Sequence, residues 1–425
     1  MRTEDQLILE LCKTDRDEQV VRSLLVQSDL DWNRFLALIN KHEVAPLVLS
    51  RLIEFPLPDR VDERLRSAAK KEIRETTISH ATMRSELARV QHALRSAGID
   101  CILLKGLSLD YSGLRTIKDL DILVREDQFI EAIRAVEQLD YDFVGMDRTS
   151  YLKPAESRML LDAIHEPDLD EEAKTRVLET MRWNNHYEMV NRQRKILVEI
   201  HSNLFHRRRG YTENIERLLD RIDAFWTNRR YDPTLECYTL SNEYLLLLMS
   251  VHMTIKRSPA NHTFVLKLAC DLDNLVHQSP DWELLVDAAI RLRVAPFVLY
   301  ALLQTRTLLK TPIPQPVLMS LRKNCSKAQL KAVRLHLDCL RSLDSYSVVS
   351  SKLYVLMKPY VFESRLSERV KWLFLLPIFF PPRWKMAGFF NMRKDSPLIY
   401  ATYLLNPFRL IYQLAKSVVD VWGRK

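Results

Sequence analysis

LLKGLSLDYSGLRTIKDLDILV, residues 103–124, is the stretch of sequence that decides the fold. An apolar run ends at Lys105-Gly106, a short polar connection follows, and a second apolar run opens with Asp119-Leu120-Asp121. The two apolar runs predict two β-strands. Because side chains on a strand alternate between its two faces, Asp119 and Asp121 should point to the same side. A third carboxylate beside them would complete a site for a divalent cation.

The segments that follow this stretch predict further elements of a small sheet. Residues 127–139 repeat apolar side chains at helical spacing, directly after the second strand. Residues 186–190 and 195–205 have the pattern of paired strands around a polar turn. The second of these strands carries Glu199 and His201 on one face, which makes Glu199 the candidate third carboxylate.

Helical patterns surround this core on both sides. Residues 4–85 and 212–345 read as helices throughout, and glycine is scarce in the chain. The expected fold is therefore α+β, with a small sheet core embedded in mostly α-helical N- and C-terminal regions. The expected divisions are a helical region at 1–85, the α/β core at 86–210 with an insertion at about 155–180, a helical domain at 211–345, and a basic amphipathic tail at 346–425.

One helical segment is repeated along the chain. DWNRFLALINKHEVAPLVLSRLI, residues 31–53, aligns without a gap on DWELLVDAAIRLRVAPFVLYALL, residues 281–303. The two segments share Asp-Trp, Val-Ala-Pro and the Val-Leu that follows. A solenoid would need several periodic copies, so a single match predicts two similar helical hairpins on either side of the core.

Charge and cysteine spacing bear on the surroundings of the protein. The 425 residues carry a net charge of +8, and the six cysteines show no CxxC spacing. Such cysteines favour buried thiols in a reducing compartment over zinc ligands or disulfides. The N-terminus lacks a signal-peptide layout, and no apolar run approaches the roughly 18 residues of a membrane-spanning helix. We therefore expect a cytoplasmic location, with contact at the inner face of the membrane as an addition.

The basic character of the chain belongs to its last part. Residues 351–425 contain thirteen Lys or Arg and four Asp or Glu. From Tyr400 to Trp422, apolar residues recur at helical spacing beside Arg409 and Lys416. This pattern favours contact with an anionic membrane surface. Packing on the body of the protein and contact with nucleic acid are the alternatives, although no recognised RNA-binding module is visible.

The tripeptide Asp-Leu-Asp by itself carries little information. It occurs four times, at residues 29–31, 119–121, 168–170 and 271–273. Only the copy at 119–121 follows a strand and a glycine turn and then opens a strand. The other copies are expected at a helix start, in the polar insertion and on a helix, where acids are solvated. For the copy at 119–121, the structural alternative is a strand-edge turn capped by acids.

Three carboxylates on adjacent strands are typical of a metal site. Asp119, Asp121 and Glu199 would repel one another when ionised, and a doubly charged cation relieves that repulsion. Gly106 has no β-carbon and would let backbone amides approach a triphosphate. Phosphate charge could be balanced by the nearest basic groups, Lys105 and Arg115. His201 joins this nucleotide-binding set, with a packed, hydrogen-bonded histidine as the alternative role.

The whole stretch 103–124 resembles the core of the uncharacterised bacterial nucleotidyltransferase family within the polymerase-beta-like superfamily. That family has an apolar strand, Lys-Gly, then Arg and Asp-x-Asp opening a second strand, and later an acid two residues before a histidine, which is similar to Glu199-Ile200-His201. The resemblance extends more weakly over residues 4 to about 310. It departs from the superfamily at Leu107, where a serine or glycine is common, and at Glu199, where aspartate is usual.

The resemblance implies transfer of a nucleoside monophosphate from an NTP such as ATP, with Mg²⁺, or Mn²⁺ as the alternative ion. It also implies that the core is a small mixed sheet with helices, and that Asp119, Asp121 and Glu199 are the metal ligands. The acceptor stays open between a small molecule, a sugar phosphate, a peptide or protein, and tRNA. A second hypothesis is a catalytically silent nucleotide-binding or scaffold protein associated with membrane-bound polysaccharide machinery, which the departure at Leu107 favours.

Overall fold

The computed structural model describes most of the chain outside two long segments. The described residues are 2–145, 186–204, 221–255, 266–338 and 343, together with 386, 390, 397–398, 400–409 and 412, except for 28–29, 58, 111 and 192. The expected insertion at about 155–180 and most of the expected tail lie outside these residues.

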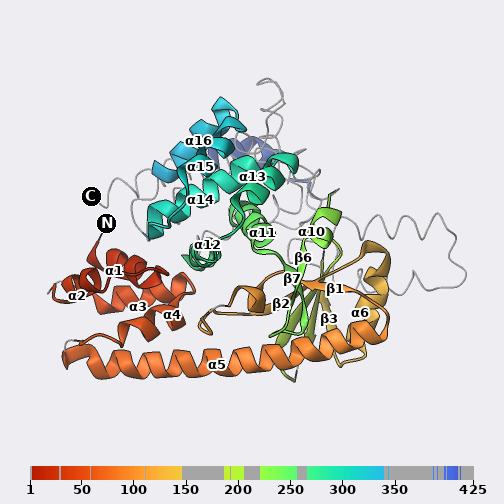
Figure 1. The fold of residues 1–425 in the computed structure, drawn as a ribbon, viewed down its shortest axis with the longest axis horizontal. Helices are drawn as coiled ribbons and strands as arrows, with labels where there is room; N and C mark the ends of the chain where they lie inside the picture. Colours follow the sequence, from red (N-terminus) through yellow and green to blue (C-terminus); the bar gives the residue numbers. More distant parts are fainter. Residues whose placement is uncertain are drawn as a thin grey trace, which may run out of the picture.

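A seven-stranded mixed sheet forms the centre of the fold, with strand order β3-β4-β5-β2-β1-β7-β6 (Figure 1). The β2–β5 and β1–β7 pairs are parallel, and the other neighbouring pairs are antiparallel. The strands are β1 (Cys101–Leu103), β2 (Asp119–Val124), β3 (Asp142–Gly145), β4 (His186–Asn191), β5 (Ile196–His201), β6 (Arg229–Asp232) and β7 (Cys237–Leu240). The α+β fold with a mixed sheet, predicted from the sequence, is confirmed.

Helices precede, interrupt and follow the sheet. The N-terminal helices are α1 (Thr3–Cys12), α2 (Glu18–Leu25), α3 (Trp32–Lys41), α4 (Ala45–Leu52) and the long α5 (Asp59–Ser96). Between the strands lie η1 (Gly106–Leu109), η2 (Glu126–Gln128), α6 (Phe129–Glu137) and α10 (Asp223–Thr227). The last helices with defined bounds are α11 (Asn242–Ile255), α12 (Leu266–His277), α13 (Trp282–Arg291), α14 (Ala295–Leu309), α15 (Gln315–Lys323) and α16 (Lys327–Asp338).

The period-two alternation of the strands divides the apolar core between the two faces of the sheet. Leu120 and Ile122 of β2 are buried in one cluster with apolar residues of α5 and α6. Leu123 belongs to a second cluster, which it shares with α11 and the N-terminal helices. Figure 1 shows α5 running beneath both the N-terminal helices and the sheet. This helix therefore joins the helical region to the core.

The repeated segment folds twice into the same helical hairpin, as predicted. α3–α4 and α13–α14 begin at equivalent caps, where the Asp31 and Asp281 carboxylates accept backbone N–H groups. At the turn, Glu43 and Arg293 occupy the same register and have positive φ angles of 55° and 58°. Both hairpins contribute buried side chains to one continuous cluster, so they pack into the same body.

Residues 212–345 are not entirely helical, and the sequence-based expectation is wrong there. β6 and β7 extend the sheet beyond β1, with Leu103 opposite Thr239 in a parallel pair. Each strand has four residues, and Tyr231 and Tyr238 lie exposed with ring centroids 5.7 Å apart. So short a pair, with apolar rings on its outer side, gives only a weak strand pattern in the sequence.

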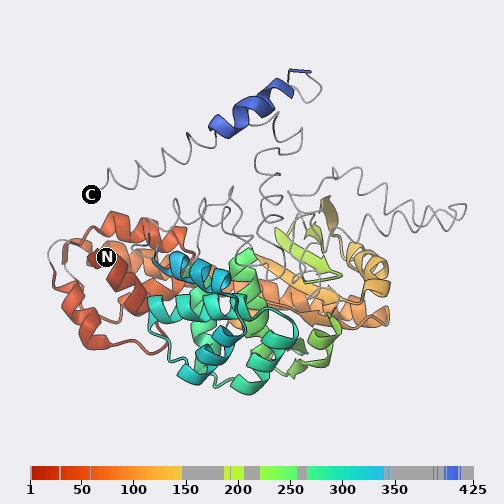
Figure 2. The ribbon, with the colours of Figure 1, turned by 90° about the horizontal axis from the view of Figure 1, so that it is seen from above.

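The cysteines and helices in the described part of the chain bear on the expected thiols and on the question of membrane-spanning segments. Five cysteines there are free, and Cys12, Cys237 and Cys270 are buried. Among the described helices, none has the length and apolar character needed to cross a bilayer. Residues 400–409 form a further helix, coloured blue in Figure 2.

Candidate active site

Two neighbouring parallel strands bring acidic and imidazole side chains together. β2 pairs with β5 in a register that sets Asp121 opposite Glu199, and Leu123 opposite His201. Residues opposite one another in such a ladder project to the same side, and so do residues two positions apart on one strand. Asp119, Asp121, Glu199 and His201 therefore share one face of the sheet.

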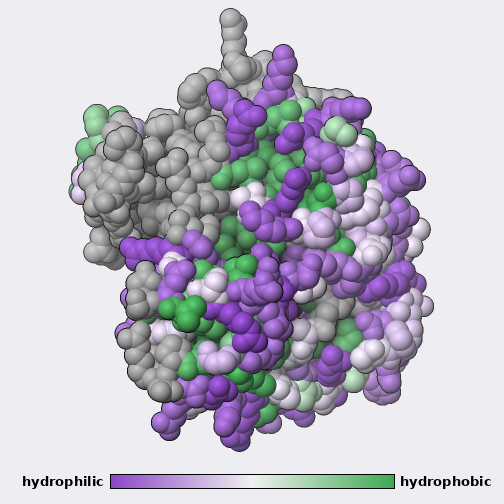
Figure 3. All heavy atoms as spheres, turned by 60° about the vertical axis from the view of Figure 1, so that its left-hand side comes forward, coloured by the Kyte–Doolittle hydropathy of each residue, from purple (hydrophilic) through white to green (hydrophobic). Residues whose placement is uncertain are grey.

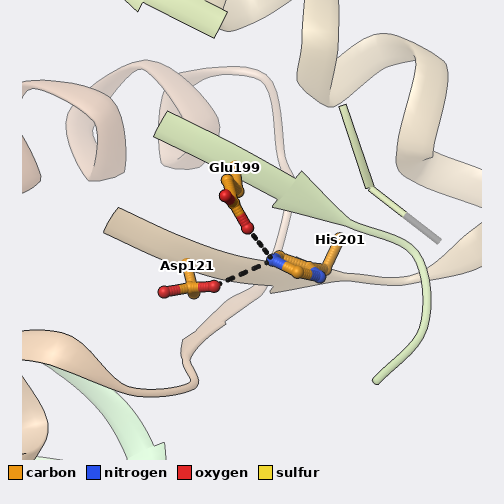
Figure 4. Close-up of side chains that lie close together, drawn as sticks. All are labelled: Asp121, Glu199 and His201. Carbon is orange, nitrogen blue, oxygen red and sulfur yellow. Dashed lines mark hydrogen bonds and ion pairs between the residues drawn. The ribbon is translucent and has the colours of Figure 1, made fainter. Parts of the chain in front are cut away.

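Three of these side chains converge on one point (Figure 4). His201 Nε2 lies 3.1 Å from Asp121 Oδ1 and 3.3 Å from Glu199 Oε2. All three residues are buried, and Asp121 has no exposed surface. Burial alone would lower the pKa of His201, but its hydrogen bonds to Asp121 and Glu199 outweigh that effect and raise the pKa. A positive charge is thus favoured at this point.

Lys105 supplies a second positive charge to the same acids. Its ammonium donates a hydrogen bond to Asp121 Oδ2 and lies 3.8 Å from Asp119 Oδ2. Burial opposes the charged form of Lys105, yet the nearby carboxylates raise its pKa well above the ordinary value. Asp119 is the most open of the acids, with 27% of its side chain exposed. It lies at the rim of the group, on the side that faces solvent.

The side chains present fit a divalent cation. One ligand atom each from Asp121, Glu199 and His201 lies within 4.8 Å of the others, so one ion could reach all three. Carboxylate oxygens suit Mg²⁺ and Mn²⁺, and an imidazole nitrogen is a ligand for transition metals. The structure brings His201 into this group beside Asp121 and Glu199, whereas Asp119 lies outside it.

Gly106 allows the chain to turn tightly against the start of β2. Its φ angle is +82°, and a β-carbon there would lie 3.3 Å from the carbonyl oxygen of Asp119. Both features favour glycine over any other residue. The short helix η1 begins at Gly106, within the polar connection between the two strands. Leu107 follows and is buried in the core.

Arg115 is held by an acid that sequence reasoning assigned to solvent. Its Nε and a terminal guanidinium nitrogen donate to the two oxygens of Asp271 at 2.8 and 3.0 Å. Asp271 is only 2% exposed, and Asp273 two residues later is 1% exposed. The expectation that the acids at 271–273 are solvated is therefore wrong. Asp271 raises the pKa of Arg115 despite the opposing effect of burial.

Other polar contacts fix the connection between β1 and β2 to the helices. His80 on α5 lies 2.9 Å from Asp110, and its Nε2 donates to the carbonyl oxygen of Arg115 at 2.6 Å. Glu43, at the turn of the first hairpin, accepts from both Lys118 and Lys267. Sequence reasoning missed these residues because their partners are 30 to more than 200 positions away.

The comparisons with known proteins bear on the chain as a whole. A family model described as "Uncharacterised nucleotidyltransferase" matches residues 28–310, which is about two thirds of the chain and includes the sheet and the acid–histidine group. No curated protein matches the chain. No solved structure matches it either.

Proposed function

The chain belongs to the family of uncharacterised nucleotidyltransferases, and on this premise we propose that it is a metal-dependent enzyme that moves a nucleoside monophosphate from an NTP to an acceptor. The acceptor oxygen attacks the α-phosphorus. A new phosphorus–oxygen bond forms, the bond to the β-phosphate oxygen breaks, and pyrophosphate leaves with that electron pair. The acceptor class remains open between a small molecule, a sugar phosphate, a peptide or protein, and RNA.

The side chains that would hold the metal are Asp121, Glu199 and His201, with Asp119 as a further oxygen ligand at the rim. Mg²⁺, or Mn²⁺ in its place, would supply charge neutralisation and alignment of the triphosphate when bound. Glu199 also helps to activate the acceptor. These roles use the one face of the sheet on which all four side chains project.

Three further residues would handle the triphosphate. Lys105 packs against Asp121 and lies close to Asp119. If a metal ion neutralised these carboxylates, the Lys105 ammonium would be able to turn to a phosphate oxygen. Gly106 keeps a β-carbon away from the start of β2. Arg115 already has a bidentate carboxylate partner in Asp271, and the charge of Asp119 also acts to raise its pKa.

One observation supports this proposal more than any other. Oxygen and nitrogen atoms of Asp121, Glu199 and His201 lie within 4.8 Å of one another in a buried position, and the partly exposed Asp119 shares Lys105 with Asp121. Two buried carboxylates facing each other are unfavourable unless cations neutralise them. A site that needs cations, and that is open on one side at Asp119, is suited to a metal with a phosphate substrate.

The experiment follows the label of the nucleotide. The protein is incubated with NTPs labelled at the α-phosphate, with Mg²⁺ or Mn²⁺ and host lysate, and the molecule that acquires label is identified. We expect labelled product and released pyrophosphate with the wild type, and neither with Asp121→Asn. The matched control is Asp273→Asn, the same substitution in the other described Asp-Leu-Asp copy that is buried. Full transfer by Asp121→Asn would overturn the proposal.

A catalytically silent nucleotide-binding or scaffold protein is the second candidate, and two observations favour it. Lys105 and His201 pair with the buried acids and neutralise them without a metal ion. Leu107, where the superfamily commonly has a small or hydroxyl residue, is buried in the core and offers no hydroxyl. Calorimetry separates the candidates, since tight NTP binding without pyrophosphate release across candidate acceptors would support the silent protein.

A further inference from the structure

The helix at residues 400–409 has its polar and apolar sides reversed. Its polar side chains Thr402 and Asn406 are 6% and 0% exposed. Its apolar side chains Leu404, Leu405 and Phe408 are 76%, 54% and 70% exposed. A helix that packs on its own protein usually buries the apolar side and exposes the polar one.

The exposed residues form one continuous side of the helix. At 100° per residue, Leu404, Leu405 and Phe408 lie within one third of a turn of each other, whereas Thr402 and Asn406 lie on the opposite side. Leu398 before the helix and Tyr412 after it are two further exposed apolar side chains, at 65% and 66% exposure. We call Leu404, Leu405 and Phe408 the outer apolar side.

The buried polar side is itself anchored. Asn406 Oδ1 accepts a hydrogen bond from Arg409 Nε at 2.9 Å. Met386 is fully buried and packs with Tyr403, which belongs to the inner half of the helix. Both contacts lie within the tail, on the inner side of the helix, and the outer apolar side faces away from them.

The figures show where this side lies. In Figure 2 the helix (blue) stands beyond the described helices and strands of the body. In Figure 3, on the margin of the molecule that corresponds to this position, apolar side chains (green) gather at the upper left. Large apolar side chains that gather on an exposed surface usually mark a binding site.

The charge of the surrounding sequence indicates what binds there. Residues 351–425 contain thirteen Lys or Arg against four Asp or Glu, whereas the rest of the chain is nearly neutral. A sequence that combines an apolar helix side with a large excess of basic residues suits the headgroup region of an anionic bilayer. The ten-residue helix is about 15 Å long, half of the roughly 30 Å hydrocarbon core, so it would lie in the interface.

We propose that the outer apolar side docks on an anionic phospholipid membrane, with Leu404 and Phe408 inserted at the headgroup boundary and the net positive charge of residues 351–425 attracting the protein to the lipid phosphates. This interaction is independent of nucleotide transfer, because none of its residues belongs to the candidate active site. It would place the site near acceptors at the membrane surface.

The test uses the full-length protein and vesicles of two compositions. Binding is measured by flotation with phosphatidylcholine vesicles that contain about one third phosphatidylglycerol, and with pure phosphatidylcholine vesicles. We expect binding to the anionic vesicles that weakens as salt is raised, and little binding to the neutral ones. In the variant Leu404→Gln/Phe408→Gln, the partition coefficient should fall at least about tenfold.

The matched control replaces two apolar residues that are exposed elsewhere, Val26→Gln/Ile78→Gln, at 84% and 55% exposure. It should bind anionic vesicles as the wild type does. Thermal unfolding of all variants confirms that the exposed substitutions leave the fold intact. Equal binding by the Leu404/Phe408 variant and the wild type would overturn the proposal. So would a wild type that ignores anionic vesicles but self-associates, or binds a protein, through this same side.

Discussion

In the described part of the chain, two copies of Asp-Leu-Asp contain buried acids, and they do different things. On β2, side chains two residues apart project to the same face, so Asp119 and Asp121 both contact Lys105. On helix α12, residues two apart are separated by about 200°, so Asp271 and Asp273 face different neighbours. Asp271 forms an ion pair with Arg115, whereas Asp273 accepts a hydrogen bond from the backbone N–H of Thr14, near the N-terminus.

The difference shows how secondary structure decides what a pair of acids can do. Two acids on one strand face concentrate negative charge, and that charge requires Lys105, His201 or a metal ion nearby. Two acids on a helix distribute the charge to separate partners, and each can be fully satisfied by hydrogen bonds. The strand copy is therefore suited to binding an ion. The helix copy is suited to connecting α12 with Arg115 and with Thr14.

The largest effect should follow from Asp121→Asn in the strand copy. This change removes a carboxylate from the centre of the group with Glu199 and His201, so turnover should fall about a thousandfold or more. Calorimetric titration with Mn²⁺ should show loss of metal binding in the same variant. Wild-type turnover with intact metal binding would mean that the strand copy is structural, like the helix copy.

Asp271→Asn should have the next largest effect. This variant tests whether the helix copy influences the active site through Arg115. The amide cannot replace the bidentate ion pair, so Arg115 loses its orientation while its charge stays buried. We expect kcat/KM for the NTP to fall about 10- to 100-fold, mainly through KM, with stability reduced by about 3 kcal/mol.

A structural role of Asp271 alone would lower stability without changing KM in the folded enzyme. Steady-state kinetics below the unfolding transition, with the folded fraction measured by circular dichroism, separate the two outcomes. Asp271→Glu is the companion variant. It keeps the charge and should recover part of the NTP affinity if Arg115 is positioned by a carboxylate.

Asp273→Asn should reduce stability and leave catalysis unchanged. Asp273 accepts hydrogen bonds from the Thr14 backbone N–H at 2.8 Å and from the Thr311 hydroxyl at 2.5 Å. An amide would face one of these donors with its own N–H groups, at a cost of about 2 kcal/mol. Urea unfolding measures this loss, and turnover per folded molecule should equal that of the wild type. Lower turnover per folded molecule of Asp273→Asn would mean that Asp273, like Asp271, influences the active site.

The contrast between the two copies also explains what could be read from the sequence. The pair Asp119 and Asp121 could be placed on one face because the period of a strand is known and the flanking apolar run marks the strand. The partner strand could be found because Glu199 and His201 share the same period. Local periodicity was therefore enough to predict the α+β core and to place Asp121, Glu199 and His201 on neighbouring strands, but not to show that Asp119 lies outside the group they form. The repeated hairpins were predicted from the internal match between residues 31–53 and 281–303.

The remaining features depend on contacts between distant parts of the chain. Asp271 was expected in solvent because nothing near it in sequence shows that Arg115, 156 residues earlier, lies against it. The reversed helix at 400–409 has the expected apolar stripe, but the sequence cannot tell which side the protein buries. β6 and β7 are too short for their alternation to be distinguished from a loop. Tertiary packing decides each of these cases.

The smallest predicted effect concerns the ion pairs that attach α12, which carries the helix copy, to the first hairpin. Burial by itself would raise the pKa of Glu43, but the charges and hydrogen bonds of Lys267 and Lys118 outweigh burial and lower it to about 2. A carboxyl whose pKa is lowered on folding stabilises the protein above its unfolded pKa. This stabilisation is lost as the pH falls from about 4.5 to about 2.

Glu43→Gln should therefore reduce the free energy of unfolding by about 1–2 kcal/mol at pH 7, since the partly exposed pair is screened by solvent. The difference from the wild type should vanish as the pH approaches 2. Glu236→Gln is the matched control, because Glu236 has the same left-handed backbone, with φ 51°, but is exposed. Urea unfolding at several pH values measures both. A Glu43 effect that does not change with pH would show that packing, and not charge, attaches α12 to the hairpin.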